Sequence, residues 1–313
     1  MTRSKRIAVA GGTGGIGSHI VEGLLEIKKR DSLHIIVLSR SSKPDVQFAG
    51  ASAPVIGVDY KNRSCKNTKS TPSSPRFLDI RTFADIFEVT QQRLLDAALK
   101  VPSIHRFAPS EFAVHSERLV SAPLYQHKIP ILRSLRKVKE TRPNFEFTAF
   151  SVGIFMNYLG YGNPKPDGAK AHGHLQHFPY IVDLSKAAAD VPGDGNIKFA
   201  WTTAEDVGRF TAAATQLDKW DEETNMAGEV ITINEVINIA ESITGKKFDV
   251  KYNTEQDLLA RMDPNPTSPF GNFYLEVYLG IVRGECEMEI NLNGLVDVNP
   301  TSVKEYLQKW WGN

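Results

Sequence analysis

The chain has 313 residues, of which 41% are hydrophobic and 23% are charged, proportions that are ordinary for a globular protein. Its 37 basic and 36 acidic residues leave a formal net charge of +1. Without a long single-sign block, this balance does not favour nucleic acid or an anionic membrane as a partner. A chain of this length buries a substantial core, as one large domain or as two smaller ones.

The two cysteines, Cys65 and Cys286, lie far apart in the sequence and have no metal-like spacing. One disulfide stays open as an alternative, but a reduced, intracellular protein fits this cysteine usage better. The apolar run at residues 7–10 is too short for a signal peptide, and no later run approaches the length of a membrane span. We therefore expect a soluble, cytoplasmic protein.

A buried strand is predicted at residues 6–10, and it leads into the glycine-rich segment GGTGGIG and then into an amphipathic helical pattern. Strand, glycine turn and helix in this order are the context of a dinucleotide-binding fingerprint. Gly11 permits the tight turn, Gly14 the approach of a pyrophosphate, and Gly17 the close packing of helix on strand. The predicted cofactor residues of this turn are Gly11, Thr13, Gly14, Gly15, Ile16 and Gly17.

The second predicted strand, residues 34–38, is followed by Ser39 and Arg40, with Lys43 nearby. A site specific for NAD usually has a carboxylate here, which binds the ribose 2′-hydroxyl. A hydroxyl and two cations suit a 2′-phosphate instead. We therefore expect NADP(H) with these three residues in its site, the alternative being that Arg40 is only a solvated loop residue.

The remaining pattern of the first half alternates strands with helices. Strands are predicted at residues 55–58, 104–108 and 145–151, and a helix at residues 90–100. This alternation indicates an α/β fold with a doubly wound parallel sheet. Asp59, directly after the third strand, is counted among the predicted cofactor residues.

Capping patterns predict three helices in the second half of the chain. The first covers residues 204–217 and follows Thr203. The second begins after Thr232 and ends at Gly245, and the last begins after Ser302. These helices indicate further α/β structure beyond the nucleotide-binding half.

Five motifs occur along the chain in this order: GGTGGIG, HRFAPSEF (residues 105–112), Lys128, FTAFSVGIFMNYL (residues 147–159) and VPGDGN (residues 191–196). Together they resemble the NmrA-like and isoflavone-reductase-like family of atypical short-chain dehydrogenases, in a fungal-type version. The resemblance implies a Rossmann-type NADP(H) domain at residues 1–155 and a smaller, mainly substrate-binding α/β domain at residues 156–313. Residues 197–217 are expected to pack back on the first domain, and a small-molecule substrate is expected between the two.

Family members with reductase activity carry a lysine after the SEF segment, and Lys128 matches that position. The resemblance implies that Lys128 protonates or holds a substrate oxygen as hydride arrives, or orients the nicotinamide ribose. An exposed lysine at a helix start is the alternative. Pro130 suits only a first turn and so places Lys128 at the mouth of a helix. Tyr125, three residues before the lysine, is a second catalytic candidate.

The SEF segment lies against the cofactor in the family. By resemblance, the predicted cofactor residues therefore extend to Pro109, Ser110, Glu111, Phe112, Lys128, Gly153 and Phe155. A capping or structural role is the alternative for Glu111. Gly153, Ile154, Phe155 and Met156 are expected to form a floor near the nicotinamide.

Three nearby histidines, His172, His174 and His177, raise the question of a metal. They come without a carboxylate–histidine motif, and hydride transfer needs no metal. We expect no metal site, and a loop that lines the cleft.

The family also places a strand between Tyr60 and the helix at residues 90–100, where KSTPSSPRF (residues 69–77) stands. Two prolines exclude a central strand, so irregular structure is predicted over residues 63–82. Codons allowed for these residues, read two bases later, can encode the apolar strand Val-His-Thr-Val-Ile-Ser-Ala-Phe. A frameshifted or mis-spliced segment at residues 63–77 and a genuine divergent loop both stay open.

Two functions of different classes follow. The first is an NADPH-dependent reductase of a small lipophilic carbonyl or conjugated, aromatic or polyketide-like substrate, of the kind found in secondary metabolism, with Lys128 acting on the substrate oxygen. The second is an NADP(H)-binding, redox-sensing regulator of NmrA type without turnover. The oligomeric state stays open.

Overall fold

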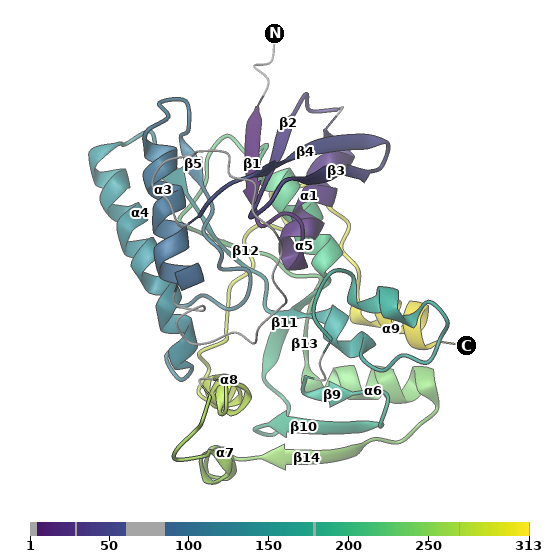
Figure 1. Ribbon diagram of the computed structural model, residues 1–313. Coiled ribbons are helices and arrows are strands. Elements are labelled where there is room, and N and C mark those ends of the chain that lie inside the picture. Colours follow the sequence, from purple (N-terminus) through teal and green to yellow (C-terminus); the bar gives the residue numbers. More distant parts are fainter. Residues whose placement is uncertain (1–4, 29, 61–84, 178–179, 269, 313) are drawn as a thin grey trace.

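The computed structural model describes residues 5–28, 30–60, 85–177, 180–268 and 270–312. The segment predicted to be irregular, residues 63–82, and the proposed frameshift within it lie outside the described residues. Figure 1 shows α3 (Gln91–Leu99) and α4 (Ile129–Thr141) side by side on one flank, with β10 (Ala188–Pro192) and β14 (Asp249–Asn253) at the end of the molecule opposite β1 (Arg6–Ala10).

The nucleotide-side sheet has the strand order β1-β2-β4-β3. Strands β1 (Arg6–Ala10), β2 (His34–Ser39) and β4 (Ala51–Gly57) are parallel, which confirms the first three predicted strands. Strand β3 (Lys43–Phe48) was not predicted, and it pairs antiparallel with β4. It is an edge strand in the described sheet, which is the position that tolerates a proline such as Pro44.

The next strands are shorter than the sequence predicts. Strand β5 (Arg106–Phe107) pairs with β6 (Glu146–Phe147), and β7 (Ala149–Ser151) pairs with β12 (Glu223–Asn225), both in parallel. The predicted strand at residues 145–151 therefore breaks at Thr148. The break arises because the chain changes partner there: the Thr148 amide donates to the carbonyl oxygen of Phe107 in β5, and its hydroxyl donates to Thr224 of β12 at 2.6 Å.

The helix predicted at residues 90–100 begins one turn earlier than expected, because a π-helix, η1 (Asp85–Thr90), runs directly into α3. A 3₁₀-helix, η2 (Pro123–Lys128), likewise precedes α4. Pro130 lies in the first turn of α4, as its sequence position predicts.

The C-terminal half holds two three-stranded sheets. One has the order β13-β11-β8, formed by β13 (Glu229–Thr232), β11 (Lys198–Thr202) and β8 (Ile154–Phe155). The other has the order β14-β10-β9, formed by β14 (Asp249–Asn253), β10 (Ala188–Pro192) and β9 (Val182–Asp183). The remaining elements are η3 (Met156–Gly160), η4 (Gly168–His172), α6 (Ile233–Thr244), α7 (Glu255–Arg261), α8 (Phe273–Val282) and α9 (Val303–Trp311).

The predicted helix caps are present. Thr232 and Ser302 each form a capping box, at the starts of α6 and α9, and Gly245 ends α6 in the left-handed conformation. Thr203 caps α5 (Ala204–Ala214) by accepting from the amide of Asp206. This helix ends three residues before the predicted boundary, because the amides of Gln216 and Leu217 donate to the carbonyl three residues back, as in a turn, and not four residues back.

Helix α5 packs directly on α1 (Gly15–Ile27) through two glycines. A Cβ atom at Gly23 would lie 2.3 Å from the carbonyl oxygen of Gly208, and one at Gly208 would lie 2.1 Å from the carbonyl oxygen of His19. The helix backbones therefore touch, a distance that side chains would prevent. Strand β11 in turn pairs with β8 (Ile154–Phe155), and the hydroxyl of Thr202 donates to the carbonyl oxygen of Val152 at 2.7 Å. The division into domains at residue 155 stays a prediction.

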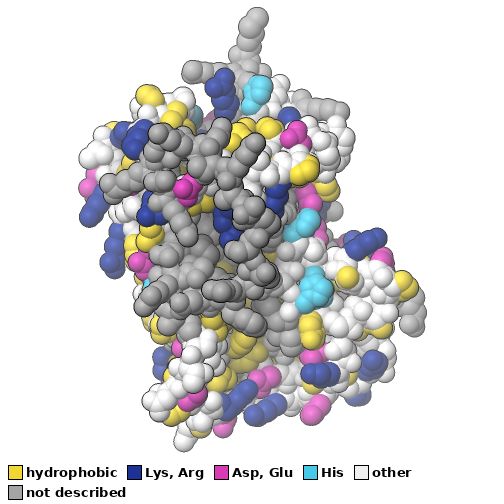
Figure 2. Space-filling view, viewed as in Figure 1, with side chains coloured by type: hydrophobic (Ala, Val, Ile, Leu, Met, Phe, Trp, Pro, Cys, Tyr) yellow, Lys and Arg dark blue, Asp and Glu magenta, His cyan; other side chains and the backbone are white. Residues whose placement is uncertain are grey.

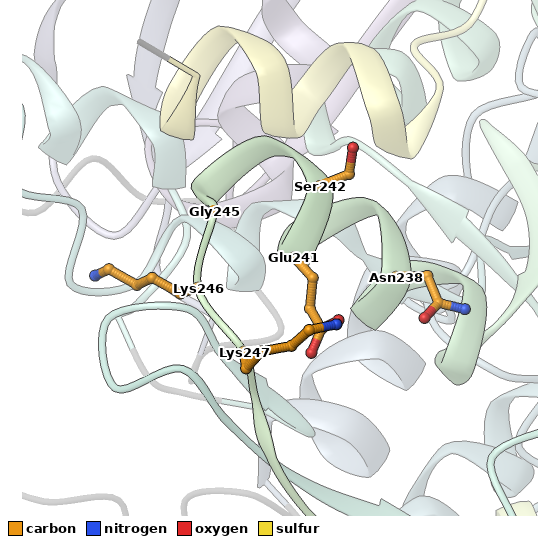
Figure 3. A pocket seen from close by; sticks show the side chains of 6 residues that line it. All are labelled: Asn238, Glu241, Ser242, Gly245, Lys246 and Lys247. Carbon is orange, nitrogen blue, oxygen red and sulfur yellow. The ribbon is translucent and has the colours of Figure 1, made fainter.

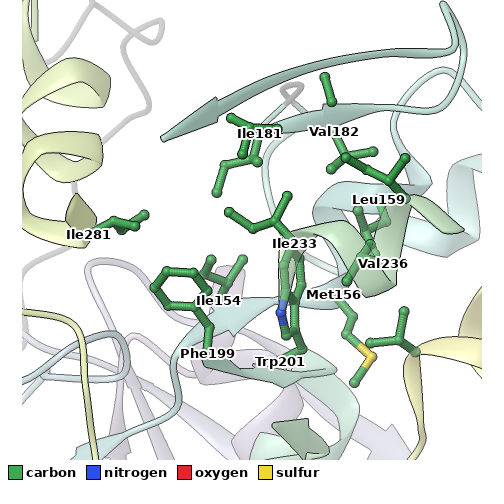
Figure 4. Packing of buried hydrophobic residues seen from close by; sticks show 14 of the residues in the cluster. Ile154, Met156, Leu159, Ile181, Val182, Phe199, Trp201, Ile233, Val236 and Ile281 are labelled. Atoms are coloured by element: carbon green, nitrogen blue, oxygen red, sulfur yellow. The ribbon is translucent and has the colours of Figure 1, made fainter. Parts of the chain in front are cut away.

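The largest hydrophobic core lies in the C-terminal half. Figure 4 shows Trp201 and Phe199 of β11 packed among aliphatic side chains from β8, η3, β9 and α6. A separate cluster, which includes Val21, Leu24 and Val37, holds α1 on the nucleotide-side sheet. Among the described helices, none is long and apolar enough to cross a membrane.

Candidate active site

The glycine-rich turn joins β1 to α1. Gly11 has a φ of +75° and Gly15 of +53°, and a Cβ atom at Gly11, Gly14 or Gly15 would meet no other atom within 4 Å. Gly17 differs, because a Cβ atom there would lie 2.5 Å from the carbonyl oxygen of Gly11. Gly14 begins α1 without a side-chain cap, so the first amides of the helix face an open cradle of the kind that binds a pyrophosphate.

Hydroxyl groups and a cation gather beside this cradle. Nζ of Lys43 donates to Oγ1 of Thr13 at 3.3 Å, and that oxygen lies 3.5 Å from Oγ of Ser39. Arg40 is exposed next to them. Lys43 is the first residue of β3, and the β3–β4 hairpin brings it back over Thr13. The three predicted 2′-phosphate residues thus share one corner with the glycine turn, while Asp59 lies just beyond the end of β4.

The SEF segment follows β5 and is held by buried hydrogen bonds. The amide of Ser110 donates to Oε1 of Gln91 at 2.6 Å, and the amide of Glu111 donates to the carbonyl oxygen of Pro109 at 2.9 Å. Glu111 is 1% exposed, and its Oε2 accepts from the amide of Ser116. Phe112 has a φ of +32° and stacks on Phe150, a strained backbone of the kind found at functional sites.

Lys128 is buried, so the alternative interpretation, an exposed lysine at a helix start, is wrong. It ends η2 and precedes α4, and its side chain is 7% exposed. Its Nζ donates to the carbonyl oxygen of Glu111 at 2.6 Å. Burial lowers the pKa of the Lys128 amine, and the nearby charge of Glu111 opposes that shift.

Tyr125 lies one turn of η2 before Lys128. In a 3₁₀-helix the residues at i and i+3 lie above one another, and the Nζ of Lys128 is 5.0 Å from the centre of the Tyr125 ring. The same Nζ is 5.2 Å from the centre of the Phe87 ring, so the cation lies against two aromatic side chains. Burial raises the pKa of the Tyr125 hydroxyl, which keeps it protonated at neutral pH.

An apolar pocket of about 150 Å³ lies next to Tyr125. Gly153, Ile154 and Phe155 line it, and their position near the nicotinamide stays a prediction. Its other lining residues are Ala113, Val114, Tyr125, Tyr158, Tyr180, Phe199, Ala200, Phe273, Tyr274, Val277, Ile281 and Cys286. None of these side chains carries a charge at neutral pH, so the pocket suits an uncharged ligand.

Two expectations about the floor and the cleft do not hold for this pocket. Met156 does not line the pocket but is fully buried in the core beside Gly228. The histidines do not line it either. His172 is buried at the end of η4 and stacks on His177 at 3.8 Å between ring centres, and His174 contacts α1.

The pocket and the glycine turn meet over one buried cluster, which includes Phe150, Val152 and Phe210. Ile16 from α1, Phe112 from the SEF segment and Phe155 from β8 pack against it. Side chains from three distant segments with predicted cofactor residues therefore pack against one cluster, and one of them, Phe155, also lines the pocket.

The aromatic wall that α8 and Tyr180 contribute to the pocket was missed by the sequence prediction. Phe273, Tyr274 and Tyr180 belong to no motif, and no charge pattern marks them. The signal was compositional: the segment PFGNFYLEVYLG, residues 269–280, is rich in aromatic residues.

A second hollow lies far from these groups, at the C-terminal end of α6 (Figure 3). A single short segment, residues 238–247, lines it, and Lys247 pairs there with Glu241. It offers no aromatic surface and no buried titratable group. Elsewhere, the described part of the face in Figure 2 mixes cations and anions without a broad single-sign patch.

Comparison with known proteins places the chain in a family. The model of the NmrA-like family matches residues 3–306. The chain belongs to the NmrA-like family. Its relatives include the oxidoreductase BOA1 of Botryotinia fuckeliana (strain B05.10), 30% identical over 251 residues, which cover 78% of this chain and 77% of that protein. The isoflavone reductase of Glycine max is 24% identical over 338 residues, 99% of this chain and all of that protein (100%).

Solved structures of the NmrA-like fold agree with the architecture. A crystal structure of isoflavone reductase superimposes with a TM-score of 0.66 at 20% identity, over 98% of this chain and 99% of that one. AtPrR2, solved with NADP⁺ and (+)pinoresinol, gives a TM-score of 0.65 at 18% identity, over 99% and 98% of the two chains. The predicted Rossmann-type α/β fold is therefore confirmed.

Proposed function

We propose that this protein is an NADPH-dependent reductase of a small, uncharged, lipophilic carbonyl or conjugated substrate. The observation that carries the proposal is the position of Tyr125: it lines the apolar pocket, and the Nζ atom of Lys128 lies 5.0 Å from the centre of its ring. The relatives support the reaction class, since one is named an oxidoreductase and another an isoflavone reductase.

The residues at the glycine turn fit NADP(H). The cradle around Gly11, Gly14 and Gly15 leaves room for a pyrophosphate, and α1 presents uncapped amides to it. Lys43, with Thr13 and Ser39, would hold the 2′-phosphate through charge-assisted hydrogen bonds. Support for this cofactor also comes from AtPrR2, which was solved with NADP⁺.

Bound NADPH supplies the hydride, and the protein supplies the proton that completes the reduction of a C=O or conjugated C=C bond. Tyr125 is protonated at neutral pH and faces the pocket, so it donates that proton to the developing oxyanion. Lys128 stabilises the phenolate that the proton leaves behind. Because Lys128 is not among the residues that line the pocket, it acts through Tyr125.

The pocket restricts the substrate. A cavity of about 150 Å³ matches the engineered apolar cavity that binds benzene, so it accepts the ring-sized reacting part of a larger molecule. Aromatic rings from Phe155, Tyr180 and Phe273 suit a planar, conjugated group. Charged substrates such as carboxylates would lose their hydration without a partner.

The experiment is an NADPH-oxidation assay against a panel of aromatic ketones and enones. Wild type, Tyr125→Phe and Lys128→Met are compared, with Tyr252→Phe as the control, because Tyr252 is exposed on β14. The proposal expects turnover that is lost in the first two variants and kept in the control. Turnover that survives in both Tyr125→Phe and Lys128→Met would contradict it.

An NADP(H)-sensing regulator without turnover is the second candidate. One observation favours it: the Lys128 Nζ is already engaged by the Glu111 carbonyl oxygen at 2.6 Å. Tight NADPH binding without oxidation by any member of the panel is the outcome that this candidate expects.

A further inference from the structure

A turn from the C-terminal half is fastened onto α1. The amide of His174 donates to Nε2 of His19 at 3.0 Å, and Nε2 of His174 donates to Oε1 of Glu22 at 2.6 Å. Nδ1 of His19 lies 3.4 Å from Oε2 of Glu22, and the two imidazole centres are 4.7 Å apart. We refer to His19, Glu22 and His174 as the α1 clasp.

The turn that bears His174 is shaped to lie on His19. Gly173 has a φ of +56°, and a Cβ atom there would lie 2.5 Å from both Cε1 and Nε2 of the His19 ring. Only glycine tolerates both the backbone conformation and the contact. The ring of His19 is itself 2% exposed, closed in between the turn and α1. The turn therefore packs against α1 at one position, the ring of His19.

The ligand atoms of the clasp lie within 4.8 Å of one another, a spacing that invites a metal. The hydrogen-bond pattern opposes that interpretation. Because Nε2 of His19 accepts the His174 amide, the neutral ring carries its proton on Nδ1, which cannot then bind a metal. The clasp is a hydrogen-bonded fastening with Glu22 between two histidines.

Contacts between described residues continue from the clasp to the pocket. Oε1 of Glu205 would lie 3.0 Å from a Cβ atom at Gly173, and its Oε2 accepts from Nδ2 of Asn157 at 3.1 Å. The same Nδ2 donates to the carbonyl oxygen of Ala171, at the base of the turn, at 3.0 Å. Asn157 is fully buried in η3, between the pocket residues Phe155 and Tyr158.

We propose that His19, Glu22 and His174 are positioning residues, which hold the Phe155–Tyr158 wall of the pocket at a fixed position relative to α1. Helix α1 carries the glycine turn at its N-terminus, so the clasp sets the distance between the cofactor cradle and the pocket wall. The functional meaning rests on the proposed function, because it takes the pocket as the substrate site. The claim that the α1 clasp holds this wall in place does not depend on the proposed function.

Cys286 provides a readout that needs neither substrate nor turnover. It lines the pocket, is 5% exposed, and burial raises the pKa of its thiol to about 12. Its reaction with a disulfide reagent such as DTNB is therefore slow until the pocket wall opens. The measurement uses a Cys65→Ser background, so that Cys286 is the thiol that reacts.

The variants are His174→Ala, Glu22→Ala, their double variant and the conservative His174→Gln, which keeps a donor near Glu22. Glu26→Ala is the matched control, because Glu26 is exposed one turn further along α1. Loss of a charge-assisted hydrogen bond should speed the labelling of Cys286 about fivefold in either single variant. The double variant should add little more, since both changes break the same contact.

The proposal requires that His174→Gln restores slow labelling, that Glu26→Ala stays at the wild-type rate, and that the thermal midpoint changes too little to explain the rate. With a substrate in hand, KM should rise more than kcat falls. Unchanged labelling in His174→Ala and Glu22→Ala would overturn the proposal. So would equal acceleration in Glu26→Ala, or labelling that follows global unfolding. A missing reductase activity would leave the labelling result, and hence the claim that the α1 clasp holds this wall in place, intact.

Discussion

The Nζ atom of Lys128 donates a 2.6 Å hydrogen bond to the main-chain carbonyl oxygen of Glu111. This bond connects the residue that precedes α4 to the SEF segment. It holds the ammonium beside the Tyr125 ring, and Lys128 is not among the residues that line the pocket. The Lys128 ammonium is buried, and its described partners are one carbonyl oxygen and two aromatic rings. In this position Lys128 acts at the site through its charge.

Replacing Lys128 with methionine should therefore separate catalysis from stability. The flexible apolar side chain fills the same space without the desolvation of a charge. We expect kcat to fall at least about 100-fold, while the thermal midpoint stays the same or rises. The assay is NADPH oxidation beside thermal denaturation. A marked loss of stability with unchanged kcat would show that the lysine is structural.

The lowered pKa of Lys128 predicts how activity and the free energy of unfolding depend on pH. Burial favours the neutral amine, so the ammonium is lost at a pH below the usual lysine value of 10.5. Activity that needs the cation should fall as the pH rises through this lowered pKa. Stability has the opposite sign: the unfolded chain binds the proton more tightly, so unfolding free energy should rise between the folded pKa and 10.5. The measurement is the pH dependence of kcat and of urea unfolding, and Lys128→Met should lack the rise in stability.

Cofactor choice should depend on the corner formed by Thr13, Ser39 and Lys43. Lys43→Ala and Arg40→Ala each remove a cation, and a charge-assisted hydrogen bond contributes roughly 1.5–3 kcal/mol. The Kd for NADPH should rise about 10- to 100-fold, while NADH binding stays unchanged. Fluorescence titration with both cofactors checks this, with Lys304→Ala on the exposed face of α9 as the control. Equal losses for both cofactors would place these cations elsewhere than at a 2′-phosphate.

The contact between α1 and α5 should tolerate no added methyl group. In Gly208→Ala the new Cβ atom would lie 2.1 Å from the carbonyl oxygen of His19, so the helices must separate. We expect a loss of about 1–3 kcal/mol of unfolding free energy, measured by urea denaturation. Gly294→Ala is the matched control, because its Cβ atom would meet nothing within 4 Å. Similar losses in both variants would contradict the close helix contact.

The local parts of the fold were predictable from sequence because local chemistry decides them. The strand predicted at residues 34–38 contains a run of β-branched and aliphatic residues at 35–38, and each capping box, at Thr232 and Ser302, lies within four consecutive residues. Strand β3 escaped prediction because Lys43, Pro44 and Asp45 are poor strand formers, and pairing with β4 overrides that preference. The break at Thr148 depends on a partner, Thr224, that is distant in sequence.

The candidate site was predictable where motifs mark it. The glycine turn, Ser39, Lys43 and the SEF segment were all found by pattern. The burial of Lys128 was not, because Phe87 and Tyr125 close over it only in three dimensions. His174 was expected only in a loop that lines the cleft, because its partners, His19 and Glu22, lie about 150 residues away in the sequence (155 and 152).

The most direct test of the proposed reductase follows deuterium from NADPH labelled at nicotinamide C4 into the products of the aromatic ketone and enone panel. The account predicts deuterium on the reduced carbon with the wild type, and formation of that product at least about 100-fold more slowly with Lys128→Met. Wild-type protein that binds NADPH but transfers no deuterium to any member of the panel would contradict it.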